Sequence, residues 1–264
     1  MNPHGNTVLV TGGASGIGLA IAQAFSELGN RVLICGRDSE KLARAQRMNP
    51  SLHAISCDIT KSSDVETMFA AIAEQHGGFN MLVNNAGSLI PSDFLTDDEA
   101  LPKARREIET NLLGTLRITK AALPLLLHQH DAAVIMISSI VGMVPLPRSA
   151  IYSAMKAALH SFSISLRHQL LGTRVRVFEV MPPTVDTEVG KDIGGRMLSP
   201  GAVAKAVVTG VQRETHEIRM GPAKALYAVH RISPGLAERL LRRATSVPTR
   251  TGAGLPGRSP NSGR

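Results

Sequence analysis

The sequence predicts an α/β protein built on a single doubly wound parallel sheet of about seven strands, with helices on both faces. Short apolar runs alternate along the chain with longer amphipathic segments, as in strand–helix–strand units. The length of 264 residues and the hydrophobic content of 43% suit one such domain with a sizeable core. A glycine-rich segment directly after the first apolar run is the third indication, because it joins a strand to a helix.

The apolar runs are the expected strands, and helices fill the intervals between them. We predict strands at residues 7–10, 31–35, 52–56, 81–84, 133–138 and 175–181, with a seventh at 217–220 that closes the sheet. The clearest helices are expected at residues 17–28, 62–76, 103–128 and 152–171, and two short ones over 222–244.

The turn after the first strand is the first candidate site. Gly12, Gly16 and Gly18 allow backbone N–H groups to approach a pyrophosphate, and the helix that begins here adds a partial positive charge. The spacing differs from the commoner Gly-x-Gly-x-x-Gly fingerprint, and a plain tight turn is the alternative interpretation. Ser15 can add a hydroxyl to a phosphate, and Ile17 belongs to the same turn.

Tyr152 and Lys156 stand four residues apart, which places a phenol and an ammonium on one face of the expected helix. A phenol has a pKa of roughly 10, and a nearby lysine cation favours the phenolate, so we expect Lys156 to lower the pKa of Tyr152. Without other motifs, such a pair is more often a surface feature. Ser139 follows the fifth strand and adds a hydroxyl at the same sheet edge, although Ser138 offers the same chemistry.

These segments and two others resemble the short-chain dehydrogenase/reductase family. The motifs occur in the family's order at residues 11–18, at the Asn-Asn-Ala-Gly of 84–87, at Asn111, and at Ser139 with Tyr152 and Lys156. The match covers roughly residues 6 to 190. It implies a Rossmann-type catalytic domain over residues 1–244 that transfers hydride between a nicotinamide cofactor and a carbonyl or alcohol substrate.

The resemblance implies roles for single residues. Ser139 and Tyr152 would bind the carbonyl oxygen, and Tyr152 would give up its proton. Lys156 would grip the nicotinamide ribose, and Asn111 would hold a water beside it, unless its amide only bonds within its own helix. The implied catalytic residues are Asn111, Ser139, Tyr152 and Lys156.

The same resemblance places cofactor contacts at the ends of several strands. Asp58 and Ile59 resemble the adenine-contacting site, although Asp58 as a helix cap is the alternative. Residues 85–87 would run past the nicotinamide ribose. The expected cofactor contacts are Gly12, Ser15, Gly16, Ile17, Gly18, Arg37, Asp58, Ile59, Asn85, Ala86, Gly87, Tyr152, Lys156, Pro182, Val185 and Thr187, and no metal site is expected.

The residues after the second strand predict NADP(H) in preference to NAD(H). NAD enzymes usually have a carboxylate here for the ribose 2′-hydroxyl, whereas a 2′-phosphate is attracted by arginine. Gly36 occupies the acidic position and Arg37 follows it. The alternative is that Arg37 is only solvated and that Asp38 binds the ribose.

One segment departs from the family pattern. The family usually has Pro-Gly after the sixth strand, but here Pro183 follows Pro182, so a restricted residue without an N–H replaces a permissive one. Val185 and Thr187 keep the family's spacing and can reach the carboxamide. The double proline resembles the subgroup called DltE-like oxidoreductases, which defines no substrate.

The expected substrate walls are residues 89–96, 141–148 and 189–198, and the last could act as a mobile lid. Their mostly apolar content favours a hydrophobic ketone over a free sugar. Arg148 and Arg196 leave an acidic or phosphorylated substrate as the alternative.

The charge is unevenly distributed. Residues 219–264 hold nine Lys or Arg and one acidic residue, whereas 20 basic and 20 acidic residues balance over residues 1–218. The second helix of residues 222–244 is basic and amphipathic, so it either covers the protein's own core, docks on a subunit, or contacts an anionic membrane. Residues 245–264, rich in Pro, Gly, Ser and Thr, predict a disordered tail.

Partners and location are expected from the same observations. A tail with three arginines and no aromatic residue does not indicate nucleic-acid binding. Cys35 and Cys57 are expected to be reduced thiols of a soluble cytoplasmic protein, peripheral to the membrane if the basic helix binds it. The family resemblance implies a homodimer or homotetramer.

Two other functions remain as alternatives. One is a non-catalytic dinucleotide sensor or scaffold on the same fold. The other is a membrane-associated accessory protein or hydrolase with Ser139 as nucleophile, which requires a histidine as base; His160 and His168 are the histidines on the helix that carries Tyr152.

Overall fold

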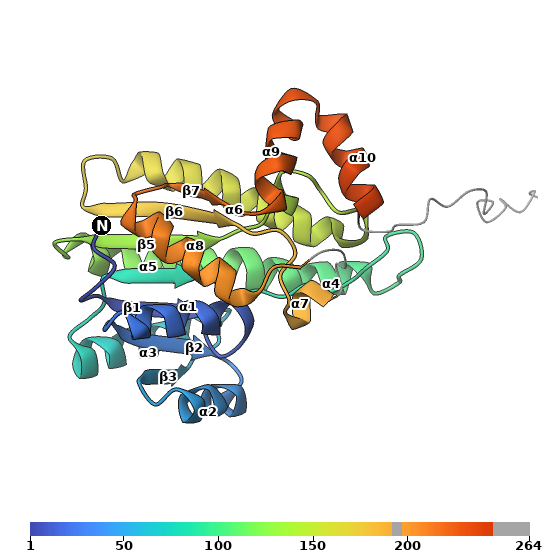
Figure 1. The fold of residues 1–264 in the computed structure, drawn as a ribbon. Helices are drawn as coiled ribbons and strands as arrows, with labels where there is room; N and C mark the ends of the chain where they lie inside the picture. The colour runs from blue at the N-terminus through green and yellow to red at the C-terminus, as the bar shows by residue number, and fades with distance from the viewer. Residues whose placement is uncertain (192–196, 245–264) are drawn as a thin grey trace, which may run out of the picture.

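A computed structural model describes residues 1–191 and 197–244 of the chain. They form a seven-stranded, wholly parallel sheet in the order β3-β2-β1-β4-β5-β6-β7, flanked by helices on both faces (Figure 1). The order reverses between β1 and β4, which is where parallel α/β sheets bind their ligands. The predicted fold class is confirmed.

The predicted strands agree with the structure to within one residue at each end. They are β1 (Thr7–Thr11), β2 (Arg31–Gly36), β3 (Leu52–Ser56), β4 (Met81–Asn84), β5 (Ala132–Ile137), β6 (Val175–Met181) and β7 (Glu217–Arg219). The helices are α1 (Gly16–Glu27), α2 (Ser39–Met48), α3 (Ser62–His76), α4 (Ala100–Glu107), α5 (Thr115–Leu127), α6 (Ala150–Gln169), α7 (Glu188–Lys191), α8 (Pro200–Gln212), α9 (Pro222–Ile232) and α10 (Pro234–Ala244).

Two hydrophobic layers cover the sheet because successive strand residues face opposite sides. In β1, Val8 and Val10 pack with α1 and α8, whereas Leu9 packs with α3, α5 and α6. Phe25 of α1 is fully buried in the first layer. Burial of both faces explains why the strands are continuous apolar runs in the sequence.

The predicted helix over residues 103–128 is interrupted in the structure. α4 leads into a π-helical segment at Ile108–Gly114, and α5 follows it. A π-helical turn holds an extra residue, which an apolar pattern of ordinary helical period does not reveal. The segment contains Asn111 and ends at Gly114, where a Cβ would lie 2.9 Å from Ile59 Cδ1, so it lies against the loop after β3.

α9 and α10 form a helical hairpin that stands away from the sheet (Figure 1). Ala223 and Leu226 of α9 and Leu241 of α10 pack against Ile140 and its neighbours in the loop after β5. The exposed apolar side chains of the hairpin are Ile232, Leu236 and Leu240. The hairpin therefore covers one loop of the site and leaves the sheet faces to other helices.

Three further features concern the sequence-based expectations. Cys35 and Cys57 are buried and free of disulfide bonds. Within residues 1–191 and 197–244, no helix is both long enough and apolar enough to cross a membrane. The expected tail at 245–264 and half of the expected lid, residues 192–196 with Arg196, lie outside the described residues.

The contact between α8 and β7 allows a test of the packing. A Cβ at Gly210 would overlap Ile218 Cδ1, whereas a Cβ at Gly201, on the same helix, would meet nothing within 4 Å. We expect Gly210→Ala to lower the free energy of unfolding by about 1–3 kcal/mol through overpacking. Gly201→Ala is the control and is expected to be neutral or stabilising by up to about 1 kcal/mol, as measured by chemical denaturation.

Candidate active site

The glycine turn after β1 is shaped by close backbone packing. Gly12 and Gly16 have φ values of 63° and 54°, which favour glycine. A Cβ at Gly12 would lie 2.9 Å from Ala86 Cα, and a Cβ at Gly18 would overlap the Asn85 side chain. These glycines therefore bring the turn against the loop after β4. Gly13, which the sequence analysis did not select, is equally constrained, since its Cβ would lie 2.6 Å from Ile34 Cγ2.

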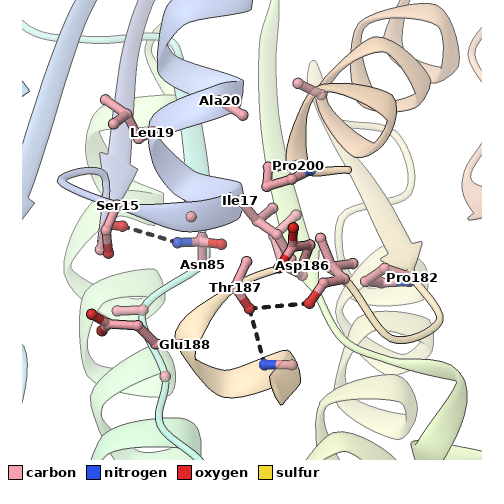
Figure 2. Close-up of a pocket in the computed structure, with 18 of the residues that line it drawn as sticks. Ser15, Ile17, Leu19, Ala20, Asn85, Pro182, Asp186, Thr187, Glu188 and Pro200 are labelled. Atoms are coloured by element: carbon pink, nitrogen blue, oxygen red, sulfur yellow. Dashed lines mark hydrogen bonds between the residues drawn. The ribbon is translucent and has the colours of Figure 1, made fainter. Parts of the chain in front are cut away.

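The start of α1 is open to an anion. Ser15 precedes the helix but makes no capping bond with its side chain, and the first turn holds no acidic residue. The partial positive charge and N–H groups of this helix end are thus left without an anionic partner from the first turn. Figure 2 shows Ile17 of this turn facing the loop after β6, which carries Pro182, Asp186 and Thr187.

Hydrogen bonds from Thr11 and Asn85 join the ends of β1 and β4. Thr11 Oγ1 accepts bonds from the backbone N–H groups of Asn85 and Ala86, both at 3.0 Å, and donates to Val83 O at 3.3 Å. Asn85 Nδ2 donates to Thr11 O at 3.0 Å and Gly12 O at 3.2 Å. The glycine turn and residues 85–87 consequently form one fixed wall.

A cavity of about 1200 Å³ runs along this wall to the groups at the ends of β5 and β6. It brings together most of the residues expected to bind a cofactor or to act in catalysis. Those that line it are Gly12, Ser15, Gly16, Ile17, Arg37, Asn85, Ala86, Gly87, Ser139, Tyr152, Lys156, Pro182, Val185 and Thr187. Gly18, Asp58, Ile59 and Asn111 do not line it.

Ser139, Tyr152 and Lys156 meet at one end of the cavity. Ser139 Oγ donates to Pro182 O at 3.3 Å and accepts from Val141 N at the same distance. Lys156 Nζ donates to Ile137 O at 2.8 Å and lies 5.4 Å from the centroid of the Tyr152 ring. The helix that carries Tyr152 and Lys156 is fixed by Gly142, whose Cβ would lie 2.7 Å from the Lys156 carbonyl carbon.

The pKa of Tyr152 departs from the expected direction. Burial raises it above its ordinary value, and the negative charge of Glu107 raises it further. Burial also lowers the pKa of Lys156 to about 8, against the opposing effect of Glu179. The net shift of the Tyr152 pKa is therefore opposite in direction to the expected one, because desolvation and the Glu107 carboxylate both raise it.

Asn111 is buried beside the cavity. Its Oδ1 accepts from Ser88 N at 2.8 Å, and its Nδ2 donates to Ser88 O at 2.7 Å. The Asn111 amide thus holds the loop after β4, and the alternative of an amide bonded within its own helix is wrong. The pairing also fixes Gly87, whose Cβ would lie 3.1 Å from Asn111 Oδ1.

The charged residues after β2 and β3 differ in what they contact. Asp38 Oδ1 accepts from Lys41 N at 2.9 Å and caps α2, while Arg37 is exposed and lines the cavity. Asp58 Oδ1 accepts from the N–H and hydroxyl of Thr60. Burial raises the pKa of Asp58, but the bonds from Thr60 and the charges of Lys61 and Arg37 leave it below its usual range.

A polar network that was not predicted from the sequence lies behind the cavity. Ser138 Oγ donates to Glu179 Oε1 at 2.5 Å, and Glu179 Oε2 lies 2.8 Å from His160 Nδ1. Glu107, fully buried in α4, accepts from Ile90 N at 2.9 Å. A charged residue in the middle of the apolar run at 175–181 is the signal that could have identified Glu179.

The same network argues against a hydrolase. In a serine triad the histidine lies between the serine and the carboxylate, so that it can take the serine proton. Here the carboxylate of Glu179 lies between Ser138 and His160, and the hydroxyl of Ser139 donates to a backbone carbonyl. His160 is thus not in the position of a base for Ser139.

The fold and the site together place the protein in the class of doubly wound α/β proteins with a glycine turn at the point where the strand order reverses. A family model described as short chain dehydrogenase matches residues 6–197. The chain belongs to the short chain dehydrogenase family.

Several relatives agree with this assignment. The chain is 42% identical over 187 residues to the uncharacterized oxidoreductase DltE of Bacillus subtilis, covering 71% of this chain and 74% of the relative. An uncharacterized oxidoreductase of Staphylococcus epidermidis is 34% identical over 212 residues, which is 79% of this chain and 91% of that one. A crystal structure of a short chain dehydrogenase from Burkholderia cenocepacia in complex with NADP has a TM-score of 0.79 and 29% identity, covering 94% of this chain and all of the other.

The role of Asp38 can be tested without a ligand. We expect Asp38→Ala to lower the free energy of unfolding by about 1 kcal/mol, because it removes the N-cap of α2. Asp38→Asn keeps a capping oxygen and should cost much less. Equal losses in the two variants, measured by urea denaturation, would show that the charge and not the cap matters.

Proposed function

We propose that this protein reduces a mainly hydrophobic ketone with NADPH. The observation that carries the proposal is that Ser139, Tyr152 and Lys156 line the same cavity as the glycine turn, with the Lys156 ammonium 5.4 Å from the centroid of the Tyr152 ring. Hydride transfer is the chemistry that a bound nicotinamide cofactor supplies in such a site.

The residues of the cavity fit a dinucleotide. The turn packs Gly12 against Ala86 and Gly16 against Thr187, and the open start of α1 favours a pyrophosphate. Arg37 is exposed at the cavity and suits a 2′-phosphate, while Asp38 is engaged as a helix cap. The NADP in the Burkholderia relative supports the same preference.

Ser139 and Tyr152 would hold the substrate carbonyl. With the Ser139 hydroxyl turned from Pro182 O to the substrate, two donors would stabilise the negative charge that grows on the carbonyl oxygen in the transition state. Burial and Glu107 keep Tyr152 protonated at neutral pH, so its phenol is present in the acid form that reduction requires. Lys156, with a pKa of about 8, exchanges protons near neutral pH and is suited to resupply Tyr152.

The surroundings of Tyr152 favour an apolar substrate. Val141, Leu146 and Leu226 cluster beside its ring, and Leu89 lines the cavity on the opposite loop. A ketone with a hydrophobic body would place apolar surface against the cavity side of this region, where Leu89 lies, and this is favourable. The double proline places its first carbonyl against Ser139, so this loop also orients the serine hydroxyl.

Cofactor preference is tested by calorimetric titration with NADPH and, separately, NADH. We expect the wild-type protein to prefer NADPH, and Arg37→Ala to weaken NADPH binding by roughly tenfold or more while leaving NADH binding nearly unchanged. Arg44→Ala, on the exposed face of α2, removes the same charge and serves as the control. Binding of neither cofactor by the wild type would overturn the proposed function.

The proton donor is tested by removing one hydroxyl. Tyr152→Phe should lower turnover of a panel of hydrophobic ketones by at least about 100-fold, with cofactor affinity changed by no more than about twofold. Tyr227, the second tyrosine of the chain, stacks with Arg219 and provides the matched Tyr→Phe control. Loss of cofactor binding together with turnover would mean that Tyr152 has a structural role instead.

A further inference from the structure

Glu179 is a charged residue in an otherwise apolar central strand. It lies in β6, between β5 and β7, and its side chain is 0% exposed. A buried carboxylate is costly unless hydrogen bonds and opposite charges compensate it. The hydrogen-bond partners of Glu179 therefore indicate the role of its charge.

Both carboxylate oxygens have a hydrogen-bond partner. Ser138 Oγ donates to Oε1 at 2.5 Å from the end of β5, and His160 Nδ1 lies 2.8 Å from Oε2. His160 is 19% exposed, so it can exchange protons with water, whereas Glu179 cannot. The chain of contacts thus leads from the solvent to the interior of the site.

The same contacts surround the anchoring point of Lys156. His160 stands one turn after Lys156 on α6, and Lys156 Nζ donates to Ile137 O, the residue before Ser138. Glu179 therefore contacts the residue directly after Ile137 on one element and the residue one helical turn after Lys156 on the other. Its negative charge raises the pKa of Lys156 against the larger effect of burial.

We propose that Glu179 is a positioning residue that keeps Lys156 protonated, and that His160 sets how much of the Glu179 charge Lys156 feels. The proposal rests on the function proposed above. It adds that Glu179 and His160 connect the charge of the site to the protein surface. When His160 is neutral, the negative charge of Glu179 stabilises only the Lys156 ammonium. When His160 is protonated, its positive charge offsets part of the Glu179 charge, and Lys156 is stabilised less.

Charged groups on neighbouring elements also bear on this relay. The bond to Glu179 raises the pKa of His160, burial lowers it, the charges of Glu179 and Glu217 raise it, and Arg219 lowers it. Glu217 and Arg219 lie on β7 and pair with each other. Glu107 acts on Tyr152 from α4, on the other side of the site.

The test measures the titration of Lys156 directly in the purified full-length protein without added cofactor. Trace labelling with acetic anhydride over a range of pH, followed by mass spectrometry, gives the midpoint at which Lys156 loses its proton. Glu179→Gln should lower this midpoint by about one pH unit, because the attraction between opposite charges is lost. To the extent that His160 holds a proton at this pH, His160→Gln should raise the midpoint, because the Glu179 carboxylate no longer shares its charge with an imidazolium.

Glu217→Gln is the matched control, since it makes the same change on the adjacent strand, at the residue paired in register with Glu179. It should leave the Lys156 midpoint nearly unchanged. An unchanged midpoint in Glu179→Gln, or a downward shift of similar size in His160→Gln, would overturn the proposal. If Glu179→Gln does not fold, Glu179→Asp keeps the charge, and its midpoint should stay near the wild-type value while that of His160→Gln rises.

Activity provides the second readout. In Glu179→Gln the alkaline limb of kcat/KM should move to lower pH by about one unit, with activity at acidic pH close to that of the wild type. A uniform loss at all pH values would indicate a structural role and overturn the proposal. Failure of the wild type to bind NADPH would overturn the proposed function alone, because the labelling still reports on Lys156.

Discussion

The site depends on the hydrogen bonds between Thr11 and the loop after β4. One threonine hydroxyl accepts from two successive backbone N–H groups, and the Asn85 amide returns two bonds to the end of β1. These bonds join the strands at the point where the order of the sheet reverses. The glycine turn can pack closely on Ala86 only because this loop is held in place, and Asn111 in turn holds the far end of the loop at Ser88.

The electrostatics of the site arise from burial more than from pairs of charges. Desolvation shifts the pKa values of Tyr152 and Lys156 in opposite directions, up for the phenol and down for the ammonium. Two buried carboxylates then act from opposite sides, with Glu107 on the phenol and Glu179 on the ammonium. Both groups are thereby kept in their protonated forms near neutral pH, which suits an acid more than a base.

Sequence patterns predicted the sheet well because its strands are buried on both faces, so their apolar runs are continuous. Ser139, Tyr152 and Lys156 were predicted from their resemblance to the family's motifs, and the rule that strand ends gather at one edge predicted where Ser139 lies. The π-helical turn at Asn111 could not be predicted, since it accompanies a contact with Ser88 that only the fold creates. The shift of Tyr152 was equally hidden, because Glu107 is far from it in sequence and neighbours it only after folding.

Glu179 could be predicted only in part from the sequence. Its charge within an apolar strand is visible in the sequence, but neither Ser138 nor His160 could be identified as its partner without the structure. The sequence offers His160 as a candidate base for Ser139, whereas in the structure His160 binds the carboxylate of Glu179.

The position of the α9–α10 hairpin has a consequence for biosynthesis. Most of the expected cofactor contacts lie in the first half of the chain and leave the ribosome early, whereas β7 and the hairpin that packs beside Tyr152 follow much later. A nascent chain can therefore form the wall made by the glycine turn and residues 85–87 before the hairpin exists. The loop after β5 stays uncovered until translation has passed α10.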